Sequence, residues 1–210
     1  MRILFAALLL LFTTEVIMGQ EKGNYILVIN KDSLKVALDQ DYAYTTPSGE
    51  EVSLKIVQPN ILTYSDEMIS FKYDKSNSVS NTAIEKGIAQ CMILKSTGNG
   101  FIVQKYENMN PSSLTQFMLS EITKESISYG YTMEQKTFKK ELQGGQQLEG
   151  VEAILTYKGE KEVYTVATYG HKDQGIIVIT MLLSEDFVAA DKPMIDLFLN
   201  SLQVKIPSLD

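Results

Sequence analysis

The chain has 210 residues, of which 26 are acidic and 19 basic, and its formal net charge at neutral pH is −7. Nucleic acids and anionic membranes both favour clustered lysine and arginine, so this charge balance argues against either as a partner. The single cysteine excludes an internal disulfide, and stability must come from an ordinary hydrophobic core.

The first 19 residues are typical of a secretory signal peptide. Arg2 supplies positive charge ahead of an apolar run at residues 3–12. This run is too short to cross a membrane, which takes roughly 20 apolar residues, and it fits the apolar part of an export signal. We expect cleavage after Gly19, with the mature protein beginning at Gln20. Since no cysteine follows that site, we expect a periplasmic or secreted protein without a membrane anchor.

Residues 20–60 predict a small β-rich section. Alternating residues at 42–46 and 52–56 flank Pro47, Ser48 and Gly49. Proline sets the backbone angle of the second turn position and glycine closes the turn, so this stretch predicts a hairpin. Whether the section is a separate unit stays open on the sequence.

Residues 61–206 predict a larger domain in which strands outnumber helices. After several strands, Asn110 is placed as the N-cap of a helix with Pro111 at its first position. This helix should end near Gly130, and a final helix should begin close to Pro193. The strands are expected at residues 69–73, 88–94, 101–106, 132–142, 151–157, 162–169, 175–183 and 203–206.

Hairpin-length links join most of these strands, which favours antiparallel pairing over crossover connections. The run at 175–183 is nearly all apolar, as in a strand that is covered on both faces. We therefore expect an α+β fold: a mainly antiparallel sheet with helices on both faces, plus the small N-terminal β-rich extension.

The order of elements resembles the Mog1/PsbP-like family. The resemblance rests on Ser70–Tyr73 as the opening strand, on the successive strands within 151–183, and on the closing stretch Phe198–Val204. It implies an α/β/α sandwich over residues 61–206, and a family whose members are mostly non-catalytic accessory proteins. The chain departs from the family pattern at Asp74, where a proline is common, and it contains no tryptophan.

Residues that could carry chemistry lack the neighbours that chemistry needs. His171, the single histidine, lies in a hydrophilic turn and is expected to be a solvated turn residue. Cys91 lies in an apolar strand without the cationic setting that activates a thiol, so a buried structural role is favoured. Serine-hydrolase, phosphate-loop and EF-hand motifs are absent. We therefore assign no catalytic, cofactor-binding or metal-binding residue.

Tyrosine is abundant, with 11 residues in the chain. Exposed tyrosines favour binding surfaces, so Tyr42, Tyr44 and Tyr64 are candidate partner-binding residues. The alternative is that they pack a joint between two sheets with their hydroxyls outward.

These observations predict a non-catalytic exported accessory or binding protein. Its partner would be an unknown protein or small ligand, and we expect a monomer. One alternative is a carrier that holds a small apolar ligand between helix and sheet. Another is a carboxylate-based hydrolase of an envelope or external polymer, which would need two converging acids, one with a raised pKa.

Overall fold

The computed structural model describes residues 25–183 and 185–206. The chain divides into two compact units, Met1–Gln58 and Pro59–Asp210, and each is described by itself. The predicted signal peptide lies outside the described residues.

The N-terminal unit consists of two hairpins, each a two-stranded antiparallel sheet. Gly49 adopts a φ of +87° at the turn of the second hairpin, a conformation that glycine reaches without steric cost. An isolated parallel bridge between Leu38 and Ile56 ties the two hairpins together. The strands are β1 (Tyr25–Ile29), β2 (Asp32–Val36), β3 (Asp41–Thr45) and β4 (Glu51–Lys55).

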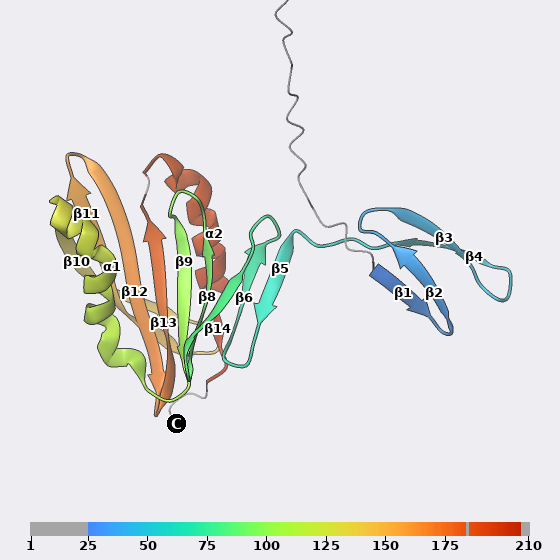
Figure 1. Cartoon of the computed structure of the whole chain (residues 1–210), viewed down its shortest axis with the longest axis horizontal. Helices are drawn as coiled ribbons and strands as arrows, with labels where there is room; N and C mark the ends of the chain where they lie inside the picture. The colour runs from blue at the N-terminus through green and yellow to red at the C-terminus, as the bar shows by residue number, and fades with distance from the viewer. Residues whose placement is uncertain (1–24, 184, 207–210) are drawn as a thin grey trace, which may run out of the picture. The chain divides into compact units, whose positions relative to one another are not determined.

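The C-terminal unit is built on a seven-stranded antiparallel sheet in the order β10-β11-β12-β13-β9-β8-β7 (Figure 1). Its centre is buried on both sides, since Ile176, Ile177, Val178 and Ile179 of β13 are at most 1% exposed. The strands are β7 (Ser80–Glu85), β8 (Ile88–Leu94), β9 (Gly100–Tyr106), β10 (Thr132–Glu141), β11 (Gln147–Tyr157), β12 (Glu160–His171) and β13 (Gln174–Leu182).

One face of this sheet carries the helix α1 (Thr115–Tyr129), which follows a short 3-10 turn, η1 (Pro111–Leu114). The side chain of Asn110 accepts a hydrogen bond from the amide of Ser112 and so caps this turn. Gly130 ends α1 in the left-handed conformation, at a φ of +113°. The helix packs on β11 and β12, where its buried Leu119 joins a core with Leu155 and Ile179.

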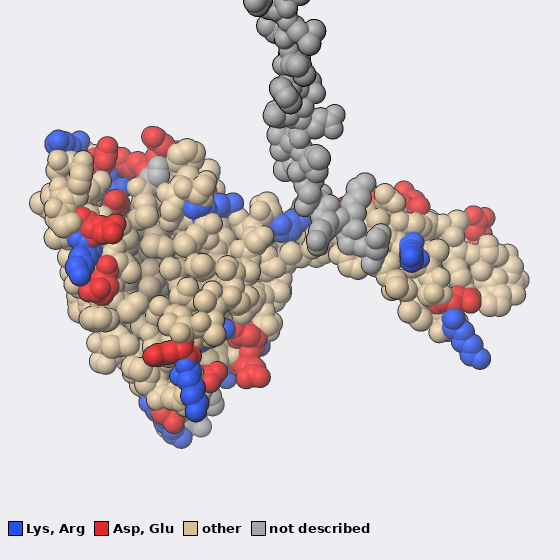
Figure 2. Space-filling model, in the orientation of Figure 1, with Lys and Arg blue, Asp and Glu red and all other residues tan. Residues whose placement is uncertain are grey.

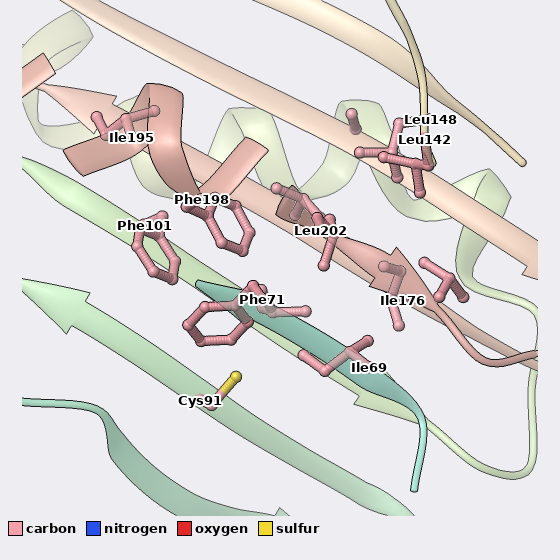
Figure 3. Close-up of a cluster of buried hydrophobic side chains, with 14 of the residues drawn as sticks. Ile69, Phe71, Cys91, Phe101, Leu142, Leu148, Ile176, Ile195, Phe198 and Leu202 are labelled. Carbon is pink, nitrogen blue, oxygen red and sulfur yellow. The ribbon is translucent and has the colours of Figure 1, made fainter. Parts of the chain in front are cut away.

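The opposite face carries the helix α2 and a second, three-stranded sheet in the order β14-β6-β5. Figure 3 shows their shared core, in which Phe198 of α2 meets Phe101 and Phe71. The rings of Phe198 and Phe101 stack with centroids 3.8 Å apart. The elements are β5 (Ile61–Ser65), β6 (Ile69–Asp74), η2 (Glu185–Phe187), α2 (Val188–Ser201) and β14 (Gln203–Val204).

The expected α/β/α sandwich is wrong, although the main sheet is antiparallel as expected. Strand makes up 54% and helix 20% of the described residues, so the fold is β-rich. One face of the sheet is covered by α2 together with a second sheet, whereas on the other face α1 packs on β11 and β12 and η1 packs on β12 and β13. The physical reason is that the two helices α1 and α2 have too little apolar surface to cover both faces of a seven-stranded sheet.

Candidate functional site

Two of the predicted tyrosines, Tyr42 and Tyr44, lie in β3 of the N-terminal unit and are half-buried. The Tyr42 hydroxyl accepts from the amide of Ala37 (2.7 Å) and donates to Gln40 Oε1 (3.0 Å). The Tyr44 hydroxyl donates to Asp32 Oδ2 (2.8 Å), and this bond raises the pKa of Tyr44. Both hydroxyls are therefore engaged within their own unit.

The third predicted tyrosine, Tyr64, belongs to the C-terminal unit and packs against its core. Its ring stacks on Phe71 with centroids 4.9 Å apart. Its hydroxyl lies 2.8 Å from Asp66 Oδ2 and 2.7 Å from Asn81 Oδ1. Tyr64 thus sits in a different unit from Tyr42 and Tyr44, and it belongs to a polar cluster of its own.

This polar cluster, which we call the Asp66 cluster, comprises Tyr64, Asp66, Cys91 and Lys105. The Lys105 ammonium lies 2.5 Å from Asp66 Oδ2, and the Lys105 side chain is only 12% exposed. Asp66 Oδ1 accepts from the amide of Met68, and from that of the next residue, at 2.9 Å each. A cleft of about 300 Å³ borders the cluster beside Asp66 and Lys105.

The ionisation of the Asp66 cluster disfavours nucleophilic or acid catalysis. Burial raises the pKa of the Cys91 thiol to about 11, and burial and the bond to Asp66 raise the pKa of Tyr64. Burial also pushes the pKa of Asp66 upward, but the hydrogen bonds from Lys105 and the two amides outweigh it, so the net shift is downward. At neutral pH the thiol and the phenol are therefore protonated and the carboxyl is ionised. The cluster instead ties the β5–β6 turn to β9.

A second partly enclosed carboxylate, Asp191 of α2, is 8% exposed and has separate partners. Asn99 donates to Asp191 Oδ2 at 2.8 Å and Thr97 donates to the same oxygen at 3.0 Å. Asn99 Oδ1 in turn accepts from the amide of Leu183. This network fixes the start of α2 to the β8–β9 turn.

His171 is buried, which differs from the solvated turn residue expected. It ends β12 and is 8% exposed, and its Nδ1 has no hydrogen-bond partner. Within the described ranges, no group of three or more histidine, cysteine, aspartate or glutamate side chains could hold a metal ion.

A different set of tyrosines gathers at the C-terminal end of α1. Tyr129, Tyr131 and Tyr157 have ring centroids 5.2 to 6.3 Å apart, and Tyr129 is 70% exposed. Lys158 lies over the Tyr157 ring at 4.9 Å. We call Tyr129, Tyr131 and Tyr157 the tyrosine cluster. Tyr157 is far from the other two in sequence, so only the pairing of β10 with β11 could have revealed it.

On the α1 side of β7, β8 and β9, no helix within the described residues packs closely over the strands. Residues paired across neighbouring strands share a face of the sheet, so the registers define this surface. Met92 pairs with Ser80 and Ile102, and Gln90 pairs with Thr82 and Gln104. Ile88 pairs with Glu85 and Tyr106, which bound this surface at one end. We call the remainder the open face, and it comprises Ser80, Thr82, Ile88, Gln90, Met92, Leu94, Ile102 and Gln104.

The open face is partly exposed, and the charged residue that the registers place on it, Glu85, lies at its end, where it pairs with Ile88. Leu94 is 43% exposed, and Ile88, Met92 and Ile102 are half-buried, whereas Cys91 and Ile93 on the opposite side of β8 are buried. Figure 2 shows a broad uncharged area over these strands, with the acidic and basic side chains gathered mainly around it. An uncharged surface of Ile, Met, Leu and Gln on rigid strands fits the centre of a protein–protein interface.

Sequence reasoning missed the open face because β8 is apolar on both of its sides. That pattern indicates a strand that is covered on both faces of the sheet. Only the position of α1 reveals that one face of β8 is uncovered. The polar pair Gln90 and Gln104 is the one signal that could have indicated it, since two amides side by side are unusual in a closed core.

Among the described residues, no helix is long and apolar enough to cross a membrane. The expected export signal falls outside those residues, so the fold neither adds to it nor counts against it.

Comparisons with known proteins give a likeness among solved structures. No family model matches the chain, and no curated protein matches it. Among solved structures, the chain matches the solution structure of cyanobacterial PsbP (CyanoP) from Synechocystis sp. PCC 6803 at 12% sequence identity and a TM-score of 0.48. The match covers 69% of this chain and 92% of that one. The matched structure is that of a PsbP protein, and the order of elements in this chain resembles the Mog1/PsbP-like family.

Proposed function

We propose that the protein is a non-catalytic accessory or binding protein that works outside the cytoplasm and holds a protein partner against the open face. The observation that carries the proposal is a partly exposed sheet surface of four apolar and four uncharged polar residues, with charge only at its Glu85 end. Charged residues are depleted at the centres of protein interfaces, because desolvating them is costly.

The geometry of the surface supports a protein rather than a small molecule as its occupant. Small-molecule sites are concave and enclose most of their ligand. The open face instead consists of three neighbouring strands, with Met92, Ile102 and Leu94 presented side by side. Methionine is flexible and polarizable, and it is common on surfaces that pack against a partner.

The ionisation states in the Asp66 cluster support a non-catalytic role. A hydrolase based on two acids needs one carboxyl with a raised pKa. Asp66 and Asp74 both have a lowered pKa, and Asp66 is engaged by Lys105. The thiol of Cys91, with its pKa near 11, is also unsuited to act as a nucleophile.

Export is the part of the proposal that rests on residues 3–12. Mass spectrometry of the protein purified from its source would test it, and we expect a chain that begins at Gln20. A full-length chain beginning at Met1 would contradict export by cleavage.

The binding part is tested with Met92→Glu, which places a charge at the centre of the open face. We expect wild-type protein to enrich a partner from an envelope extract of the source cells, and Met92→Glu to lose it. The lost partner, once purified, should bind the variant at least tenfold more weakly in calorimetry, since a buried unpaired charge is costly.

Phe187→Glu is the matched control, because Phe187 is also an exposed apolar residue, 48% accessible, but lies just before α2. It should bind like wild type. Tyr129→Glu tests whether the partner binds the tyrosine cluster and not the open face. Loss of the partner in Tyr129→Glu with full binding in Met92→Glu would assign the site to the tyrosine cluster and overturn the open face.

A carrier of a small apolar ligand is a second candidate, supported by a groove of about 390 Å³ between α1 and β10. Leu119, Ile127 and Met133 line it, and its size falls in the range of ligand sites. Native mass spectrometry of the purified protein tests this function. A ligand present in wild type and displaced in Ser120→Trp, which fills the groove, would support it. A ligand-free spectrum would count against it.

A further inference from the structure

Strand β10 forms one end of the seven-stranded sheet, and no strand within the described ranges pairs with its outer side. It is ten residues long. Edge strands expose a row of unpaired backbone groups, and proteins usually blunt them by shortening or by lysines that repel another strand. A free edge of this length therefore needs an explanation.

The backbone groups that face outward can be assigned from the β10–β11 turn. The amide of Leu142 donates to the carbonyl of Gln146 at 2.8 Å, so the backbone of Leu142 points toward β11. Backbone direction alternates along an antiparallel strand. The amides and carbonyls of the odd-numbered residues therefore point to the open edge. These residues are Met133, Gln135, Thr137, Lys139 and Glu141.

The lysines of β10 do not protect this edge in the usual way. Lys136 lies 2.7 Å from Glu152 Oε1, and Lys139 lies 2.7 Å from Glu149 Oε1. Both acids belong to β11, so two positive charges of the edge are neutralised within the chain's own sheet. A second strand alongside β10 would meet little net repulsion from them.

The sequence of β10 is complementary to itself in one antiparallel register. With a two-fold axis at Thr137, Glu134 of one copy lies opposite Lys140 of the other, and this pair forms twice. Opposite charges placed directly across a ladder are favourable. Lys140 is held on the α2 side of the sheet by a 2.9 Å bond to Asn200 Oδ1, and its pairing partner would approach on that same side.

Neighbouring registers of the two β10 strands give fewer favourable charge pairs or a shorter ladder. An axis at Lys136 places that lysine opposite its own copy and loses the Glu134–Lys140 pair. An axis at Gln135 shortens the ladder, because Lys139 and Glu141 then extend past the start of the other β10. The axis at Thr137 alone combines the full strand length with both charge pairs.

We propose that two copies of the chain associate through β10 about a two-fold axis at Thr137, joining their main sheets into one. The contact is isologous, so it closes at a dimer. From the sequence we expected a monomer, and the free, self-complementary edge is the feature that changes this expectation. The dimer goes beyond the proposed function and does not depend on it, because the open face lies at the other end of the sheet.

Exchange of charges tests both the dimer and its register. Light scattering and sedimentation should give a dimer mass for the full mature chain. Glu134→Lys and Lys140→Glu should each raise the dimer dissociation constant by about tenfold or more, since each turns two attractive pairs into repulsive ones. The double variant E134K/K140E restores opposite charges and should return to the wild-type constant.

A cysteine pair provides a second test that does not depend on charge. Residues in a hydrogen-bonded antiparallel pair have Cα atoms about 5.5 Å apart, which a disulfide can span. Thr137→Cys should therefore form a covalent dimer on oxidation, visible on a non-reducing gel. Gln135→Cys is the matched control, because Gln135 faces Lys139 of the other copy and should remain uncrosslinked.

Three results would overturn the proposal. A monomer mass at every attainable concentration removes the dimer. A dimer that E134K and K140E leave intact places the contact elsewhere. Crosslinking of Gln135→Cys in place of Thr137→Cys shows a different register.

Discussion

Asp66 illustrates how a partly enclosed carboxylate is kept ionised in this fold. It accepts hydrogen bonds from Lys105 and from two backbone amides at a single chain reversal between β5 and β6. Together these donors overcome the cost of burial and lower its pKa. The residue therefore links the ionisation of one side chain to the attachment of the second sheet.

Acid should weaken the C-terminal unit through Asp66. Its pKa is lower in the folded than in the unfolded chain, where it is about 3.9. The stabilisation is therefore complete above about pH 4 and is lost as the pH falls through the folded value. We expect urea unfolding to show a smaller loss of stability in acid for Asp66→Asn than for wild type, because the variant has no carboxylate to protonate at this position.

Asp173→Asn, in the exposed β12–β13 turn, is the control and should follow wild type. Equal pH dependence in wild type and Asp66→Asn would show that Asp66 has no part in acid sensitivity.

The elements differ in how well the sequence predicts them. The β13 expectation of 175–183 matches Gln174–Leu182, because a long apolar run bounded by turns specifies a central strand locally. Asn110 caps its helix as expected, although the first turn is 3-10. The final helix begins at Val188 rather than near Pro193, so Pro193 lies inside the helix, where it has no N–H to donate to the preceding turn.

What could not be predicted depends on contacts between distant residues. β7 is exposed along its length, so it lacks the apolar alternation that indicates a strand. The separate sheet of β5, β6 and β14 depends on pairings such as Ile69 with Val204. The open face was missed for the same reason, because the coverage of a strand is set by where a remote helix packs. The prediction of Tyr42, Tyr44 and Tyr64 depends on residue type alone, which does not indicate their hydrogen-bond partners.

Helix α2 should depend strongly on Phe198, which is fully buried between Phe101 and Phe71. Phe198→Ala removes a ring from the centre of this core and leaves a cavity, so we expect a loss of about 3 to 5 kcal/mol in unfolding free energy. Phe117→Ala is the control, since Phe117 is 60% exposed on α1 and should change stability by less than about 0.5 kcal/mol. A similar loss in both variants would refute the central role of Phe198.

At the scale of the whole molecule, the two units differ in what stabilises them. Among the described residues, both hydrophobic cores consist of residues from Tyr64 to Ile206, and neither includes a residue of 25–58. The larger unit thus has a complete set of buried apolar contacts of its own. We therefore predict that the unit after the boundary near residue 60 folds without the N-terminal unit.

A fragment of residues 59–210 should fold alone. We expect its thermal midpoint within about 2 °C of the main transition of the mature chain, which corresponds to less than about 1 kcal/mol at this size. The measurement is calorimetry on both proteins. A fragment of residues 80–210 lacks Ile69 and Phe71 and should not fold. A midpoint that falls by about 8 °C or more in 59–210 would show that the first unit contributes to the stability of the second.

Cys91 lies at the centre of this larger unit, fully buried and protonated. A thiol reagent can reach it only when β8 parts from the elements that cover it. Since the chain has no other cysteine, every modification event reports one opening of that core. The rate at which Cys91 is alkylated in the unaltered chain therefore measures how often the core around β8 opens transiently.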